Sequence, residues 1–316
     1  MWENKRYHSL DFELKKLYGQ KIYKLSLNGG MSCPNRDGTL DTRGCIFCSE
    51  GGSGDFAASP LLTITRQIEE AKKLLAAKLV NQTAVKYIAY FQAYTNTHAP
   101  VEFLRKIFTE AINHPDIVIL SIATRPDCLS DEILQLLSEL NKKKPVWIEL
   151  GLQTIHEESA RLIRRAYPLS IFETAVNRLH SHNITIIVHT IIGLPKESKH
   201  DILKTMEYIS KLPIQGLKLQ LLHVLKGTDL GIMYEEGLFR EVLSLEEYVD
   251  IVISSLELLP EEIIIHRITG DGPRKLLLAP DWSANKKLVL NRIHNQMKER
   301  DTYQGKNYKA TDSSIF

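Results

Sequence analysis

Three of the four cysteines in this 316-residue chain lie on one glycine-rich stretch, residues 28–56. They are Cys33, Cys45 and Cys48, with the spacing C-x11-C-x2-C. Three thiolates on one loop can hold three corners of a metal centre and leave a fourth position open, whereas a structural zinc site is closed by four protein ligands. The remaining cysteine, Cys128, lies far downstream, so such a zinc site would have to recruit a distant histidine. The spacing therefore predicts a metal centre with an open position for chemistry.

Length and composition limit what such a centre can serve. With 43% hydrophobic residues, the chain can bury a core the size of a barrel domain. No apolar run approaches the ~18 residues of a membrane span, and residues 1–12 lack the apolar core of a signal peptide. We therefore expect a soluble, cytoplasmic protein without a membrane partner, whose clustered cysteines bind metal and form no disulfides. The net charge of +2 means that any affinity for nucleic acid must come from local patches.

Strand and helix signals alternate along the chain. Apolar runs typical of buried strands recur at roughly thirty-residue spacing and are followed by helical patterns; they lie at residues 22–27, 85–91, 117–122, 146–150, 184–192 and 217–222. Such units imply right-handed parallel crossovers, and a full eight-unit barrel needs about 250 residues. Residues 22 to about 259 hold six units, with a possible further strand at 263–268. The pattern predicts an α/β fold, an open, partial (β/α)6 TIM-like barrel.

The chain divides into three expected parts: a basic N-terminal segment, 1–21, the partial barrel, 22–268, and a C-terminal extension, 269–316. In the extension, Val289, Ile293 and Met297 recur at helical spacing. The rest of that helix is basic, with Lys286, Lys287, Arg292, Lys298 and Arg300. A face of this kind is usually only solvated, but beside an active site it can track phosphates. We predict RNA binding there.

The cysteine loop resembles that of the radical S-adenosylmethionine (radical SAM) superfamily. In that superfamily three cysteines bind a [4Fe-4S] cluster, and the open iron is chelated by the methionine moiety of S-adenosylmethionine. Phe47 matches the aromatic residue that commonly precedes the third cysteine, and the resemblance makes it a candidate cofactor-binding residue. The usual spacing is C-x3-C-x2-C, and the longer first gap here is similar to that of the elongator catalytic subunit and its relatives. The resemblance implies both cofactors, with iron held by Cys33, Cys45 and Cys48, and an electron donor such as flavodoxin or ferredoxin.

A second stretch extends the resemblance. The run E-L-G-L-Q-T from Glu149 to Thr154, with Arg165 beyond it, is similar to a segment of the oxygen-independent coproporphyrinogen oxidases and elongator-like enzymes. There the glutamine and the arginine contact S-adenosylmethionine, which implies a cofactor role for Glu149, Gln153 and Arg165. A guanidinium suits the methionine carboxylate, and an amide suits ribose hydroxyls. Without the resemblance, Arg165 would be taken for a solvated helix charge next to Arg161 and Arg164.

Two further strand ends carry candidate cofactor residues. Gln92 follows the second strand, where many radical SAM proteins have a GGE-like motif, and it is either an acceptor for the methionine ammonium or a core-edge glutamine. Gly193 belongs to a G-L-P turn like that of relatives in which the backbone passes close to the cofactor. His189 stands where several relatives have a ribose-binding aspartate. It is either a cofactor contact or a buried core histidine.

The third strand ends in T-R-P-D, residues 124–127, which matches a turn of elongator-like enzymes. Arg125 is our candidate for holding a substrate carboxylate, unless it only braces the turn with Asp127. Beside it, Cys128 is expected to pack as a small hydrophobe, and a hydrogen-donor role has no support.

Taken together, the chain resembles, over nearly its whole length, a bacterial family of elongator-like radical SAM proteins. One branch, the MnmL (YtqA) type, modifies the wobble uridine of transfer RNA. The resemblance implies a tRNA substrate and no DNA partner, and conversion of 5-carboxymethylaminomethyluridine, often 2-thiolated, to the 5-aminomethyl form. Two alternatives stay open: a radical SAM enzyme for a small molecule, similar to the coproporphyrinogen oxidases, and a zinc-binding RNA module without catalysis.

Overall fold

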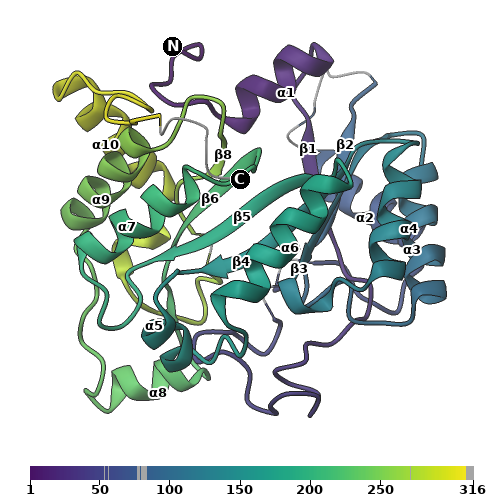
Figure 1. The fold of residues 1–316 in the computed structure, drawn as a ribbon, viewed down its shortest axis with the longest axis horizontal. Coiled ribbons are helices and arrows are strands. Elements are labelled where there is room, and N and C mark those ends of the chain that lie inside the picture. Colours follow the sequence, from purple (N-terminus) through teal and green to yellow (C-terminus); the bar gives the residue numbers. More distant parts are fainter. Residues whose placement is uncertain (53, 56, 77–78, 80–83, 271, 311–316) are drawn as a thin grey trace. The chain divides into compact units, whose positions relative to one another are not determined.

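A computed structural model describes residues 1–310 except 53, 56, 77–78, 80–83 and 271. Its main sheet has seven strands in the order β1-β2-β3-β4-β5-β6-β8 (Figure 1). The strands are β1 (Tyr23–Leu27), β2 (Tyr87–Phe91), β3 (Ile117–Thr124), β4 (Val146–Gln153), β5 (Thr185–Ile192), β6 (Gly216–Leu221) and β8 (Ile264–Arg267). Neighbouring strands follow chain order and pair in parallel from β1 to β4 and between β6 and β8. The predicted α/β fold with an open, partial barrel is confirmed, and the possible strand at 263–268 is present as β8.

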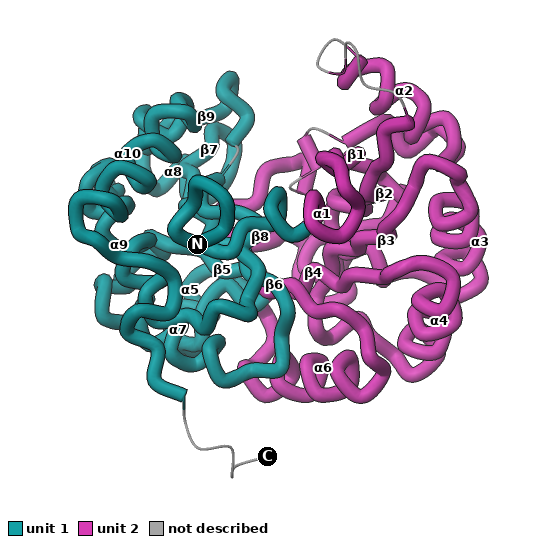
Figure 2. Tube along the Cα trace, turned by 90° about the horizontal axis from the view of Figure 1, so that it is seen from above, with its two compact units in different colours: residues 1–13, 152–165, 189–316 teal, residues 14–151, 166–188 magenta. Residues whose placement is uncertain are grey.

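The chain forms two compact units (Figure 2). We call residues 14–151 and 166–188 the amino-terminal unit, and residues 1–13, 152–165 and 189–316 the carboxy-terminal unit. The boundary between them falls within β4 and within β5.

Helices cover one face of the strands in the amino-terminal unit. They are α2 (Ile64–Ala76), α3 (Val101–Asn113), α4 (Asp131–Asn141) and α6 (Leu169–Ser181), with a 3-10 turn η1 (Pro126–Cys128) before α4. Helix α2 packs on β1 and α3 packs on β3, and the rings of Phe91 and Phe108 meet edge to face at 5.0 Å between their centroids. Ser130 caps α4 as its position predicts, because its side chain accepts a hydrogen bond from the backbone N–H of Ile133.

The carboxy-terminal unit contains β6, β8 and a second group of helices. These are α5 (Glu157–Leu162), α7 (Lys199–Ile209), α8 (Asp229–Glu235), α9 (Leu245–Leu258) and α10 (Lys286–Glu299). A small antiparallel pair, β7 (Val224–Leu225) with β9 (Leu277–Ala279), and a 3-10 turn η2 (Asp281–Ala284) join it. Helix α9 packs on both α7 and α10, which buries Val289, Ile293 and Met297 as their spacing predicts.

The first residues of the chain are more structured than their composition suggests. Ser9 forms a parallel bridge to Ile265 on β8, and Arg6 pairs with Asp301 at 2.9 Å, so the start of the chain is fastened within the carboxy-terminal unit. A helix that the sequence pattern did not indicate, α1 (Leu10–Tyr18), buries only Leu14. Within the described part of the chain, no helix is both long and apolar enough to cross a membrane.

Candidate active site

The three cysteines lie on the loop after β1, in the amino-terminal unit, and each is half-buried. Short backbone hydrogen bonds fold this loop: the N–H of Arg36 donates to Cys33 O at 2.7 Å, and the N–H of Cys48 donates to Cys45 O at 3.1 Å. The Arg36 side chain then crosses the loop at Gly44 and donates from Nη2 to Cys48 O at 2.6 Å and to Ser49 O at 2.8 Å. Gly44 has a φ of 76° and no room for a β-carbon, so glycine is required there. Arg36 thus holds the Cys45–Cys48 half of the loop, a role that the sequence analysis missed.

The electrostatics of the thiols favour a bound cation. Burial raises the pKa of Cys45 to about 12, and the neighbouring Cys48 and Cys33 raise it further. Burial also raises the pKa of Cys48, although the Arg36 guanidinium opposes that shift. Asn35 Nδ2 donates to Cys45 Sγ at 3.6 Å, which is a hydrogen bond suited to a thiolate. Because a metal centre stabilises thiolates that burial disfavours, the donor set fits a positively charged cluster.

The sulfur atoms are less tightly grouped in this structure than the ligands of a single zinc ion. Sulfur atoms on one tetrahedral zinc are about 3.8 Å apart, given a Zn–S bond of about 2.3 Å. Among the described residues, only Glu69, His114 and Asp116 form a group of three metal-binding side chains with all ligand atoms within 4.8 Å of one another. At least one pair of the three cysteine sulfurs is therefore more than 4.8 Å apart. A cluster of several irons accommodates this spread.

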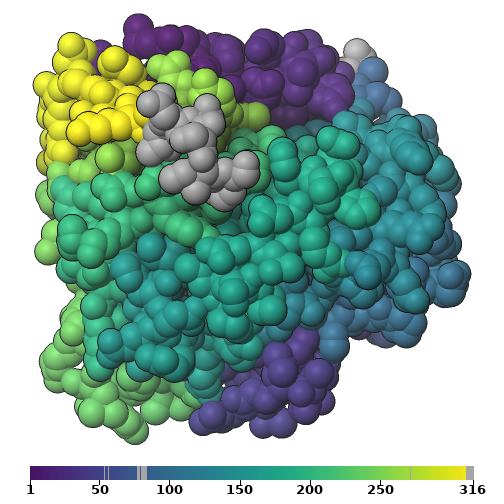
Figure 3. All heavy atoms as spheres, viewed as in Figure 1, coloured from purple at the N-terminus to yellow at the C-terminus, as the bar shows by residue number. Residues whose placement is uncertain are grey.

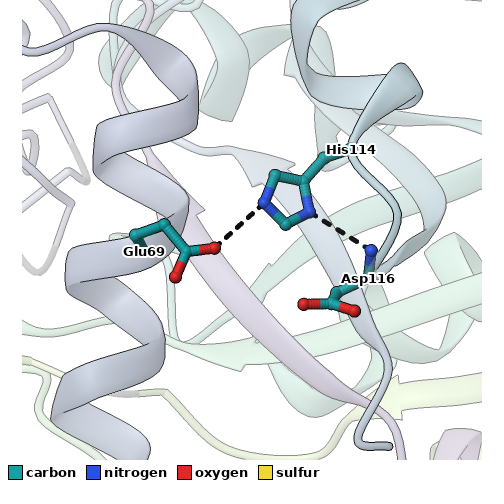
Figure 4. A group of neighbouring side chains, drawn as sticks. All are labelled: Glu69, His114 and Asp116. Carbon is teal, nitrogen blue, oxygen red and sulfur yellow. Dashed lines mark hydrogen bonds and ion pairs between the residues drawn. The ribbon is translucent and has the colours of Figure 1, made fainter.

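The Glu69, His114 and Asp116 group is itself a structural network (Figure 4). His114 Nε2 lies 3.0 Å from Glu69 Oε1, and its Nδ1 accepts from the N–H of Asp116 at 3.2 Å. The Lys72 ammonium contacts Glu69 at 2.8 Å and Asp116 at 2.7 Å, and so supplies the positive charge that a metal ion would bring. The group fastens α2 to the start of β3, which is the end of the strand opposite the catalytic edge of a parallel barrel.

Arg125 lies beside the cysteine loop and is mostly buried. It pairs with Asp127 through two hydrogen bonds, Nε to Oδ1 at 2.9 Å and Nη2 to Oδ2 at 2.6 Å, and its guanidinium lies 4.9 Å from the centroid of the Tyr167 ring. Its charge lowers the pKa of Cys45 against the larger effect of burial. Burial raises the pKa of the neighbouring Cys128 thiol to about 12, which agrees with a cysteine that packs as a small hydrophobe. Bracing of the turn by Arg125 is observed, and a contact with a substrate carboxylate stays a prediction.

Two of the expected cofactor residues, Gln92 and Glu149, belong to a polar network on β1–β4. Glu149 is 1% exposed, and its carboxylate accepts from Lys24 Nζ at 2.7 Å and from Ser121 Oγ at 2.8 Å. Gln92 Oε1 accepts from Ser26 Oγ at 2.9 Å. Both side chains thus have protein partners in the amino-terminal unit, and their contact with S-adenosylmethionine remains a prediction. The same holds for Phe47, which is half-buried on the cysteine loop.

The turn after β4, in the carboxy-terminal unit, is strained and held by Arg165. Gln153 has a φ of 63°, a left-handed backbone that is rare for a residue other than glycine. Arg165 is 1% exposed, and its Nη1 donates to Thr154 O at 2.7 Å and to Leu152 O at 3.2 Å. The alternative of a solvated helix charge is therefore wrong for Arg165. The guanidinium fixes the backbone on both sides of Gln153, and direct contact of either residue with the cofactor stays untested.

The turn after β5 has the expected glycine. Gly193 has a φ of 91° and borders a small, open, mainly apolar recess. The recess is lined in part by Leu221, Leu222, Val224, Phe239 and Leu243. His189 lies earlier on β5, with its Nδ1 3.5 Å from Gln220 Nε2 on β6. A neighbouring polar partner is compatible with both of the roles considered for His189.

The basic side chains of α10 lie at the surface, in the yellow part of the chain in Figure 3. Two of the five are paired with acidic residues of α9: Arg292 with Glu246 at 3.5 Å and Arg300 with Asp250 at 2.6 Å. Lys287 and Lys298 are exposed. The face is therefore less positive than the sequence of α10 alone suggests.

Two family models match the chain. Residues 42–209 match the radical SAM superfamily, and residues 214–299 match the radical SAM C-terminal domain. The first match alone spans more than half of the chain. The chain belongs to the radical SAM superfamily. Cys33 precedes the matched range, since the long first gap of the cysteine motif separates it from Cys45.

Similar proteins agree with this membership. YtqA of Bacillus subtilis is 46% identical over 308 residues, which are 98% of this chain and 94% of that protein. A tRNA uridine(34) acetyltransferase of Methanocaldococcus infernus is 27% identical over 165 residues, 51% of this chain and 30% of that protein. The solved structure of Elp3 from the same archaeon, lacking residues 1–46, matches with a TM-score of 0.67 and 17% identity over 90% of this chain and 64% of that one. The structural likeness shows the fold that this radical SAM protein shares.

We expect the cysteines to hold an iron–sulfur cluster that Cys128 does not ligate. Protein reconstituted without oxygen should be brown and carry about four irons and four sulfides, and Cys33→Ala, Cys45→Ala or Cys48→Ala should each lower the iron content severely. Cys128→Ala is the matched control and should retain the iron. Metal analysis and the visible absorption spectrum measure this. A colourless protein with one zinc and no sulfide would contradict the assignment.

Lys24 should be needed for stability because it neutralises the buried Glu149. Lys24→Met leaves a carboxylate buried without its cation and should lower the free energy of unfolding by about 2 kcal/mol. Adding Glu149→Gln removes the uncompensated charge and should restore part of that loss, which a double-mutant cycle in urea would measure. If Lys24→Met and the double variant lose the same free energy of unfolding, loss of the ion pair is not the cause of the destabilisation.

Proposed function

We propose that this radical SAM enzyme acts on the wobble uridine of tRNA and converts 5-carboxymethylaminomethyluridine, with or without 2-thiolation, to 5-aminomethyluridine. The observation that carries the proposal is the combination of the cysteine loop, which resembles that of elongator-like enzymes, with similarity over nearly the whole chain to YtqA. The partial similarity to an enzyme named for uridine 34 of tRNA supports the choice of substrate.

Cys33, Cys45 and Cys48 would hold the [4Fe-4S] cluster, with reduction by a small carrier of the flavodoxin or ferredoxin class. When bound, the cluster and S-adenosylmethionine supply a 5′-deoxyadenosyl radical that removes a hydrogen atom from the substrate. Gln153, Arg165 and His189 are the proposed polar residues of the cofactor site, with Arg165 acting by fixing the turn of Gln153. Gly193, whose φ of 91° is open to glycine, is the proposed point where the backbone passes close to the cofactor.

The chemistry of the substrate explains which hydrogen is removed. The methylene of the carboxymethylamino group lies between an amine nitrogen and a carboxylate, and both stabilise a radical on that carbon. Loss of a second electron to a one-electron carrier, together with the proton on nitrogen, gives an imine. Addition of water then breaks the C–N bond and releases the aminomethyl uridine and glyoxylate.

Arg125 is the proposed anchor for the substrate carboxylate. Its guanidinium has five donors in a planar fork, and Asp127 engages two of the nitrogens. A second carboxylate would therefore share the cation with Asp127. Asp127 has the further effect of keeping the planar group in one orientation.

The exposed residues of α10 would contribute phosphate contacts. Lys286, Lys287, Arg292, Lys298 and Arg300 spread along a 14-residue helix, which is about 21 Å long. The ion pairs to α9 favour a second candidate function, in which a small molecule replaces the tRNA, because Glu246 and Asp250 weaken the positive field. The two candidates differ in how binding responds to salt.

Charge reversal on α10 tests the tRNA surface. Replacing Lys286, Lys287 and Arg292 by glutamate should weaken tRNA binding and lower its salt slope by about two to three, while cleavage of S-adenosylmethionine persists. Reversal of Lys106, Lys142 and Lys143, which are exposed in the amino-terminal unit, is the control with the same charge change. Equal affinities of the two triple variants would favour the small-molecule substrate.

Isotope transfer tests the reaction itself. With tRNA deuterated at the methylene next to the carboxylate, we expect deuterium in 5′-deoxyadenosine after one turnover, because that carbon gives up the hydrogen atom. Mass spectrometry of the nucleoside products and of glyoxylate measures both outcomes. Turnover with all of the label left in the RNA product or the released fragment would rule the mechanism out.

A further inference from the structure

His223 lies just beyond the carboxyl end of β6, at the edge of the sheet from which catalytic groups of parallel barrels project. Its imidazole is half-buried. The residues on either side of it, Leu222 and Val224, line the recess at Gly193. A titratable ring thus belongs to the chain segment that forms one wall of this recess.

Two glycines of the segment after β8 make room for the His223 ring. A methyl group on Gly270 would lie closer than 3.0 Å to both Cε1 and Nδ1, and one on Gly272 would lie 3.1 Å from Cγ and 3.2 Å from Cδ2. Neither glycine has a left-handed backbone. Glycine loses more conformational freedom on folding than any other residue, so it needs a reason in the folded state. The space that the imidazole occupies supplies this reason, and the ring is seated against the backbone.

A second observation marks the same segment as a place for a polar ligand. Thr269, which precedes Gly270, is buried, and its hydroxyl has no hydrogen-bond partner among the described residues. The backbone there is fixed, since Tyr248 on α9 donates from its hydroxyl to Ile268 O at 3.1 Å. Buried hydroxyls are nearly always paired, so an unsatisfied one at a strand end indicates a missing partner.

The proposed substrate brings a proton that must leave. Its secondary amine is protonated near neutral pH, and a protonated nitrogen has no lone pair to stabilise a radical on the neighbouring carbon. The N–H bond must therefore break, with the electron pair left on nitrogen. When the C–N bond of the hydrated imine breaks later, its electrons go to nitrogen, which then takes up a proton. Imidazole is the side chain best matched to both transfers at neutral pH.

We propose that His223 is a catalytic residue that contacts the substrate amine, accepts its proton before the hydrogen atom is removed, and returns a proton to the departing aminomethyl nitrogen. The seat formed by Gly270 and Gly272 fixes the ring for both transfers. This inference rests on the proposed function. It names the side chain that accepts the proton of the substrate amine, which the radical chemistry alone does not account for.

The test uses the full-length, reconstituted enzyme with its tRNA substrate. His223→Ala should slow formation of the aminomethyl product by about 100-fold or more, and added imidazole should restore part of the rate by entering the space against the glycines. Gly270→Ala should slow the reaction more than Gly272→Ala, because its methyl group lies closer to the ring. His200→Ala, on the exposed surface of α7, is the control and should match the wild-type protein.

The outcomes separate this inference from the proposed function. If the wild-type enzyme gives no aminomethyl product, the proposed function fails. If it does and His223→Ala is equally fast, only the role of His223 fails. A slow His223→Ala variant that imidazole does not rescue, with the iron content and tRNA affinity of the wild-type protein, would show a structural role and overturn the proton transfer.

Discussion

The cysteine loop depends on compensation of buried negative charge. Three thiols on one loop are held near one another, and both burial and their mutual repulsion raise the pKa of Cys45. The protein offsets this only partly, through Arg36 and Asn35 on the loop itself and through Arg125 from the end of β3. A bound iron–sulfur cluster would supply the remaining positive charge. Arg36 also donates hydrogen bonds to the backbone oxygens of Cys48 and Ser49, which fix the shape of the loop that carries the thiols.

Strained backbone occurs at the carboxyl ends of three strands of the main sheet. Outside glycine, left-handed residues follow β2 at Tyr94 and β5 at Lys196, and one ends β4 at Gln153. Such conformations persist only where the surroundings fix them, and they concentrate at functional sites. The Tyr94 ring packs against Gly52, and its hydroxyl donates to Glu50 O, so the turn after β2 and the cysteine loop support each other. Arg165 likewise fixes the turn at Gln153, through its hydrogen bonds to Leu152 O and Thr154 O.

The sequence was most informative where local chemistry decides the structure. Buried parallel strands are continuous apolar runs, so six strands of the main sheet, and the possible seventh at 263–268, could be predicted. Helix α1 escaped prediction although Leu10, Leu14 and Leu17 recur at helical spacing, because the surrounding residues are mostly polar and only Leu14 is buried. The burial of Arg165 was also beyond a sequence pattern. Its neighbour Arg161 is exposed, and only the tertiary position of the turn after β4 decides which arginine turns inward.

The same limit applies to the surface of α10. Its own sequence shows a row of cations, but Glu246 and Asp250 approach from α9, which is distant in sequence and adjacent in space. A phosphate must therefore compete with a protein carboxylate for Arg292 and Arg300, whereas it meets the exposed Lys287 and Lys298 directly. Exposed ion pairs weaken as salt screens them, and so do contacts with phosphate. When a phosphate replaces the carboxylate partner of Arg292 or Arg300, the net charge around that arginine changes little. Binding of RNA to these five basic residues should therefore release fewer counterions than binding to five separate lysines would.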